Sequence, residues 1–119
     1  MKKAEIQANA LVMAQAAFDK KGMDITVMDL EGVSMLADFF VIVTANNAKN
    51  AQSIADQVED VAAKEGLTVL HREGYREGEW VLLDFGDIIV HVFGNDDSRE
   101  FYGLEQLWND AKIVSFEGI

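Results

Sequence analysis

The stretch WVLLDFGDIIVHVF, residues 80–93, restricts the fold more than any other part of the sequence. Two apolar runs flank Gly86 and Asp87, and a glycine at the first of two central positions is typical of a tight β-hairpin turn. Such a turn fixes which residues face each other: Phe85 and Ile88, Leu83 and Val90, Leu82 and His91, Trp80 and Phe93. We therefore expect an antiparallel pair of strands with a defined register.

Side chains alternate along a strand, so this hairpin has two different faces. One face is entirely apolar and is predicted to be core: Val81, Leu83, Phe85, Ile88, Val90 and Val92. The other face carries Trp80, Leu82, Asp84, Ile89, His91 and Phe93. Its mixture of aromatic, acidic and imidazole groups is typical of a ligand or partner surface, or of a sheet face covered by a helix.

The rest of the chain alternates between helical and strand patterns. Apolar residues at helical spacing predict a helix over residues 3–21, stopped by Gly22, and a second helix that follows the asparagines at 46, 47 and 50 and ends at Gly66. Residues 24–30, 39–44 and 67–73 predict strands, and the fully apolar FFVIVT is expected at the centre of the sheet. The sequence thus indicates the α/β class, with a single domain over residues 1–119 and a mixed, roughly five-stranded sheet flanked by helices; KIVSF is a candidate edge strand.

A last helix is predicted within NDDSREFYGLEQLWNDA, residues 95–111. Asp97, three residues before Glu100, marks its expected start. Its inward stripe is expected to be Phe101, Leu104, Trp108 and Ala111, with Tyr102, Glu105 and Asn109 on the adjoining face. Gly103 inside a helix is unfavourable, so we expect a close approach of another group there.

Charge limits the class of partner. Ten basic against twenty-one acidic residues give a net charge of −11, spread along the chain, which disfavours binding to nucleic acid or anionic membrane. A basic partner is electrostatically easier, although the charge could serve solubility alone. Cysteine is absent, no apolar run is long enough to span a bilayer, and the N-terminal residues fit an amphipathic helix; these features predict a cytoplasmic protein.

The hypothesis of an enzyme rests on the acids near strand ends: Asp24, Asp29, Asp38, Asp84 and Asp87. They could hold magnesium, but no glycine-rich loop accompanies them, and Asp84 and Asp87 point to opposite faces in the predicted register. His71 and His91 have no metal-ligand spacing and no nucleophile motif. We therefore expect no catalysis, no metal and no cofactor, and Asp87 is interpreted as a turn residue.

The succession DITVMDL, ADFFVIVTA, QSIADQV, EG, WVLLDFGDIIVHVF and SREFYGLEQLW resembles the Iojap family, also called the ribosomal silencing factor or RsfS family. The likeness runs from about residue 3 to residue 110. It is most specific in W-V-x-x-D-x-G-D-x-x-V-H-V followed by R-x-x-Y-x-L-E-x-L-W. It implies a nucleotidyltransferase-like domain without an active site, because Asp38 in ADFFVI has neither the preceding Gly-Ser nor the second acid of those enzymes.

The resemblance also implies a function. Family members bind the fourteenth protein of the large ribosomal subunit and keep the small subunit from joining, which lowers translation when nutrients are short. The residues predicted to contact the partner are Trp80, Asp84, His91, Glu100, Tyr102, Glu105 and Trp108. Asp87 and Arg99 are assigned first to turn and helix-start geometry, and helical spacing favours a buried Trp108 slightly. Two alternatives stay open: an atypical metal-dependent nucleotidyltransferase, and an adaptor that forms a homodimer through the same surface.

Overall fold

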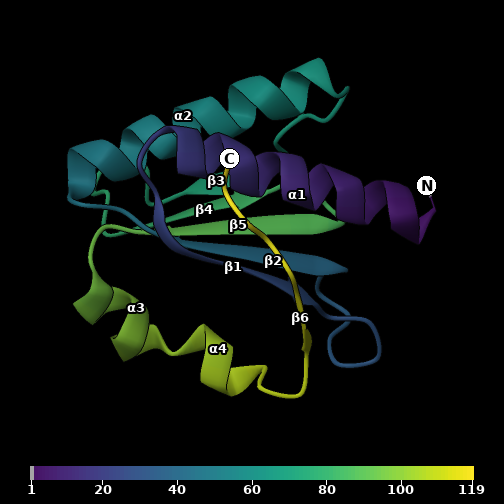
Figure 1. Ribbon diagram of the computed structural model, residues 1–119. Coiled ribbons are helices and arrows are strands. Elements are labelled where there is room, and N and C mark those ends of the chain that lie inside the picture. The colour runs from purple at the N-terminus through teal and green to yellow at the C-terminus, as the bar shows by residue number, and fades with distance from the viewer. Residues whose placement is uncertain (1) are drawn as a thin grey trace.

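The computed structural model describes residues 2–119, which form a six-stranded sheet in the order β3-β4-β5-β2-β1-β6 (Figure 1). Along the chain the elements are α1 (Lys3–Asp19), β1 (Met23–Asp29), β2 (Phe39–Thr44), α2 (Ala48–Lys64), β3 (His71–Glu73), β4 (Trp80–Asp84), β5 (Ile88–Phe93), α3 (Asp96–Tyr102), α4 (Leu104–Leu107) and β6 (Lys112–Val114). The predicted α/β class and the mixed sheet are confirmed, since β2 and β5 pair in parallel and the other neighbours are antiparallel. The sheet has one strand more than the roughly five expected, because KIVSF does form the edge strand β6 beside β1.

The predicted hairpin register is confirmed. Trp80 pairs with Phe93 and Leu82 with His91, and the N–H of Phe85 donates to the carbonyl of Ile88 over 2.9 Å. Gly86 has a φ of 92°, a conformation that suits glycine at this turn position. The two-residue turn therefore decides which side chains reach each face of the sheet.

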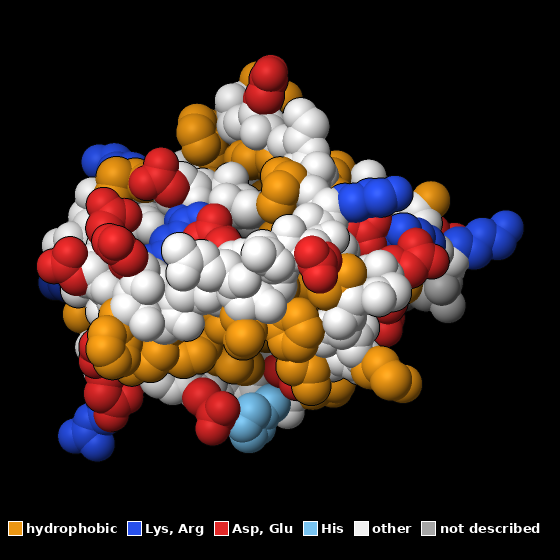
Figure 2. Space-filling model, turned by 90° about the horizontal axis from the view of Figure 1, so that it is seen from below, with side chains coloured by type: hydrophobic (Ala, Val, Ile, Leu, Met, Phe, Trp, Pro, Cys, Tyr) orange, Lys and Arg blue, Asp and Glu red, His pale blue; other side chains and the backbone are white. Residues whose placement is uncertain are grey.

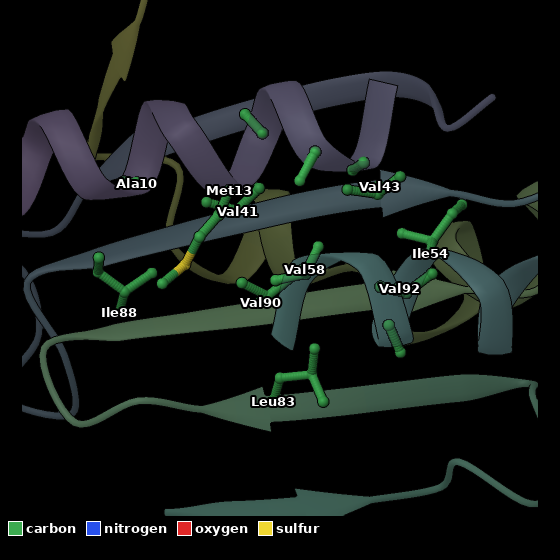
Figure 3. Packing of buried hydrophobic residues seen from close by; sticks show 14 of the residues in the cluster. Ala10, Met13, Val41, Val43, Ile54, Val58, Leu83, Ile88, Val90 and Val92 are labelled. Carbon is green, nitrogen blue, oxygen red and sulfur yellow. The ribbon is translucent and has the colours of Figure 1, made fainter. Parts of the chain in front are cut away.

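Two helices cover the predicted core face of the hairpin. Figure 1 shows α1 and α2 side by side on one side of the sheet, and Figure 3 shows Met13 of α1 and Val58 of α2 directed toward Val41 and Val90. All six residues of β2 are buried, as expected for a central strand with apolar groups on both faces. Ala10 and other small residues of α1 are fully buried, which allows that helix to lie close to the sheet.

The opposite face is covered only in part, by α3 and α4 (Figure 1). A second, smaller buried cluster lies there: Met28, Leu30, Ala37, Phe40, Ile42 and Phe93. Trp80, Ile89, Leu104, Trp108 and Ala111 pack against it while staying partly exposed. Of the two alternatives for the mixed hairpin face, a helical cover is present, and it leaves part of the aromatic surface open to solvent.

The prediction for the last helix was wrong in three respects. The helix begins after Asn95, not at Asp97, because the Asn95 side chain accepts a 2.8 Å hydrogen bond from the N–H of Ser98. It breaks at Gly103, whose φ of 57° is left-handed, so α3 and α4 are separate. The nearest atom to a Cβ at Gly103 would be 3.6 Å away, so backbone conformation and not a close approach explains this glycine.

One residue of the expected inward stripe does not face the core. Phe101 is 83 % exposed, whereas Leu104, Trp108 and Ala111 do pack inward. The third predicted strand is likewise shorter than expected, because only His71–Glu73 pairs with β4. None of the helices found among residues 2–119 has the length and apolar character needed to cross a membrane.

Candidate partner-binding surface

The Arg99 side chain connects the α3–α4 segment to β1 and β2 through hydrogen bonds. Its guanidinium donates to the Glu105 carboxylate over 2.8 and 3.1 Å, to the Thr44 hydroxyl over 3.0 Å and to the Thr26 hydroxyl over 3.1 Å. It also donates to the backbone carbonyl of Asp24, and its side chain is only 11 % exposed. The sequence suggested a helix-start role for Arg99, but its side chain forms tertiary contacts to β1 and β2 that no local pattern could indicate.

An aromatic cluster joins the hairpin to α3. The ring of Tyr102 lies 4.4 Å from that of Trp80 and 6.1 Å from that of Phe93, measured between centroids. Trp80 in turn stacks on Phe93 at 5.3 Å, and Phe101 meets Tyr102 edge-on at 5.2 Å. Phe93 is fully buried, while Tyr102 is 40 % exposed. The cluster is therefore anchored in the sheet and presents Tyr102 and Phe101 to solvent.

His91 lies beneath this surface. It is 3 % exposed, and its Nδ1 accepts a 3.1 Å hydrogen bond from the indole N–H of Trp80. Burial lowers the pKa of His91 to about 4, so the ring is neutral at physiological pH and carries its hydrogen on Nε2. Nε2 is buried without a hydrogen-bond partner among the described residues, and the Phe40 ring lies edge-on at 4.6 Å. The structure thus gives His91 a positioning contact with Trp80.

The other predicted contact residues divide between the two ends of this face. Trp108 is half-buried and meets Phe40 edge-on at 6.5 Å, which favours its expected role in packing. Asp84 is at the hairpin tip, where its carboxylate accepts a 2.7 Å hydrogen bond from the N–H of Gly86. Glu100 is exposed, and together with Glu105 it lines a hollow of about 530 Å³ beside Arg99. The seven residues therefore share one side of the sheet but form no single cluster.

Figure 2 shows this side of the molecule, with a continuous band of apolar side chains next to α3 and α4 and acidic groups around it. The exposed apolar side chains of α3 and α4 include Phe101 and Leu107, which are 83 % and 67 % exposed. Sequence reasoning missed both as surface groups, because it assigned Phe101 to the core and gave Leu107 no role. The sequence also predicts only a turn over GYREGE, residues 74–79, and gives no role to Glu77 and Glu79 just before Trp80.

The acids considered for a metal site have separate structural roles. Asp29 is 8 % exposed; burial raises its pKa, but hydrogen bonds from Lys3 and from the Glu31 N–H outweigh that effect and lower it. Lys3 also contacts the Glu31 carboxylate. Asp87 uses its backbone carbonyl to accept from the N–H groups of Asp38 and Phe39. Within residues 2–119, no group of three or more His, Cys, Asp or Glu side chains is arranged to hold a metal ion.

Comparison with known proteins gives a consistent result. The family model described as "Ribosomal silencing factor during starvation" matches residues 3–119. The ribosomal silencing factor RsfS of Halalkalibacterium halodurans is 42 % identical over 104 residues, which cover 87 % of this chain and 88 % of that protein. RsfS of Bacillus subtilis is 42 % identical over 106 residues, covering 89 % of each chain.

The fold agrees with a solved relative. The crystal structure of a protein from Chromobacterium violaceum is 30 % identical to this chain and has a TM-score of 0.83. The match covers 98 % of this chain and 92 % of that one. The sequence match, the shared fold and the W-V-x-x-D-x-G-D-x-x-V-H-V stretch agree, and the chain belongs to the RsfS family of ribosomal silencing factors.

Proposed function

We propose that this protein represses translation under nutrient limitation by binding the large ribosomal subunit through its fourteenth protein and blocking the small subunit sterically. The observation that carries the proposal is the acid-rimmed aromatic surface formed by the outer face of β4 and β5 together with α3. Aromatic groups that are anchored at one edge and exposed at the other are typical anchors of protein interfaces. Trp80 and Tyr102 have this character.

Charge supports a basic protein as the partner. The chain carries a net charge of −11, and electrostatic complementarity accelerates encounter and orients docking, while buried aromatic groups supply most of the affinity. Asp84, Glu100 and Glu105 are the acidic candidates for contact, although Glu105 already binds Arg99 within the fold. His91 supports the contact surface through Trp80.

Steric blocking needs no chemical step, and this gives the proposal a quantitative test. Purified protein is titrated into isolated ribosomal subunits, and joined ribosomes are measured by sucrose-gradient sedimentation. Inhibition is expected to follow occupancy and to be complete only near one protein per large subunit. Complete inhibition at a small fraction of the subunit concentration would contradict simple occlusion, and metal-dependent turnover of labelled nucleotide would favour the enzyme alternative.

A pair of tyrosine variants localises the surface. Tyr102→Ala is expected to weaken binding to the large subunit by about 2 kcal/mol, because it removes an exposed aromatic anchor. Tyr75→Ala is the matched control, since the Tyr75 hydroxyl contacts Asp56 of α2, on the opposite face of the sheet. Urea unfolding of both variants separates a lost contact from a lost fold. Equal binding by the two variants would remove Tyr102 from the interface.

A further inference from the structure

A small pocket lies where the turn between β3 and β4 meets α3. It has a volume of about 320 Å³, at the lower end of the range for ligand sites, so it suits a single side chain better than a cofactor. The residues that give it chemical character are Glu73, Glu77, Glu79, Trp80, Leu82 and Tyr102. Three are carboxylates, two are aromatic, and no lysine or arginine belongs to the described lining.

The backbone around the pocket is tightly packed. Gly74 has a φ of 75°, and a Cβ there would lie 2.0 Å from the carbonyl oxygen of Trp80. The carbonyl of Glu79 accepts a 2.8 Å hydrogen bond from the N–H of Gly94, and its carboxylate accepts a 3.3 Å bond from the Ser98 hydroxyl. The turn that carries the glutamates is therefore held against β4 and the start of α3, which makes the pocket pre-formed.

The aromatic side of the pocket offers ring surface and no indole donor. The N–H of Trp80 is already bound to Nδ1 of His91, and the Trp80 and Tyr102 rings lie 4.4 Å apart and inclined by 44°. A cation near the face of a tryptophan or tyrosine is attracted by the ring quadrupole, and the attraction strengthens when the cation is desolvated. Trp80 and Tyr102 therefore favour a positively charged group over a hydrogen-bond acceptor.

The carboxylates are not neutralised by the neighbouring arginine of β3. Arg72 is directed to the other face of the sheet, where it pairs with Glu59 of α2 at 3.0 Å and lies 4.4 Å over the ring of Tyr75. Glu73 has a contact of 3.5 Å with His71, and both side chains are more than half exposed. The pocket thus combines uncompensated negative charge with aromatic surface, an environment suited to a lysine ammonium or an arginine guanidinium.

We propose that this pocket receives one lysine or arginine side chain of the partner protein and is the anchoring point for a basic segment of that partner. The identity of the partner rests on the proposed function above, whereas the preference of the pocket for a cationic side chain follows from its own lining. The second acidic hollow is less suited to this role, because Arg99 belongs to its lining and pairs with Glu105 there, and its described lining contains no aromatic side chain.

The first test uses small probes and the full-length protein. ¹⁵N-labelled protein is titrated with N-acetyl-arginine methylamide, and with the neutral isostere N-acetyl-citrulline methylamide, while NMR follows the indole N–H signals. Saturable shifts of the Trp80 signal are expected for the arginine probe alone, with an affinity on the order of 10 mM for so small a contact. Trp108, which packs against Phe40, is the internal reference. No response, or equal responses to the two probes, would overturn the proposal.

The second test asks whether the ribosomal partner uses the pocket. Glu73→Gln with Glu77→Gln is compared with Asp60→Asn with Glu65→Gln on exposed positions of α2 and its end; each pair removes two charges and changes the net charge from −11 to −9. The pocket pair is expected to weaken binding to large subunits about tenfold, and the control pair less than about twofold. Equal effects of the two pairs would overturn the proposal.

The two tests separate this inference from the proposed function. If the unmodified protein binds large subunits and the pocket pair behaves like the control pair, the inference fails and the proposed function stands. If the unmodified protein does not bind large subunits, the proposed function fails, and the probe titration alone decides whether the pocket accepts a cationic side chain.

Discussion

At the scale of single residues, His91 is informative because the sequence placed it among possible contacts and the structure places it underneath them. A buried imidazole that accepts from Trp80 Nε1 fixes the tilt of the indole ring, which in turn supports Tyr102. His91 therefore shapes the aromatic surface although it is itself buried. Periodicity could identify its face of the hairpin, but not the helix that covers it.

The pH dependence of stability tests the burial of His91. The pKa of His91 falls from 6.5 to about 4 on folding, so below pH 6.5 the unfolded chain binds a proton that the folded protein does not. Stability is therefore retained above pH 6.5 and lost as the pH falls toward 4, by about 2 kcal/mol between about pH 7.5 and 5. Urea unfolding at both pH values measures it. His91→Gln, which keeps an acceptor for Trp80, should remove this part of the slope, and an unchanged slope would contradict the assignment.

Trp108 is expected to act through packing. Its ring is half-buried against Phe40 and the smaller core cluster, so Trp108→Ala should lower the free energy of unfolding by about 3 kcal/mol. Leu107→Ala is the control, because that neighbour is 67 % exposed and should change stability by less than about 0.5 kcal/mol. Urea titration gives both values. Weaker ribosome binding by Trp108→Ala without a loss of stability would instead identify an interface anchor.

At the scale of elements, local sequence patterns account for the structure where a turn or a helix cap determines the backbone geometry. The Gly86–Asp87 turn fixed the whole register of β4 and β5, and the apolar run of β2 indicated its central place. Elsewhere, contacts between residues far apart in the sequence determine the length of a strand or the place of a side chain. The pairing of β3 stops after three residues, and Arg99 reaches Thr26 and Thr44 on strands far away in sequence.

Substitution of Gly103 tests whether the helix is continuous or broken there, because the two cases predict opposite changes in stability. In a continuous helix, alanine at this position would stabilise the protein by about 1 kcal/mol. In the broken segment, Gly103 has a φ of 57°, so Gly103→Ala should destabilise it by about 1 kcal/mol. Gly103→Asn is the control, because asparagine tolerates the left-handed conformation and should lose less. Midpoints of urea unfolding distinguish the two signs.

At the scale of the whole molecule, the sequence predicted the side of the sheet that carries the candidate site but not its shape. The alternation of side chains in the hairpin gave one core face and one mixed face, and the structure retains that division. The pocket beside Trp80 could not be foreseen, because its glutamates come from a turn whose position depends on contacts such as that between Glu79 and Ser98. On the sequence side, the proposal of a basic partner rests on the net charge of −11.

Salt dependence should separate the proposed ribosome binding from the alternative of a homodimer formed through the same surface. Two copies of a chain with a net charge of −11 repel each other, so added salt should strengthen a homodimer by screening the repulsion. Binding to a basic ribosomal protein should weaken under the same change, because screening removes attraction. Sedimentation of the protein alone, and with large subunits at constant magnesium, measures both constants at about 50 and 300 mM salt. Subunit binding that strengthens with salt would mean that aromatic burial, and not charge, brings the partners together.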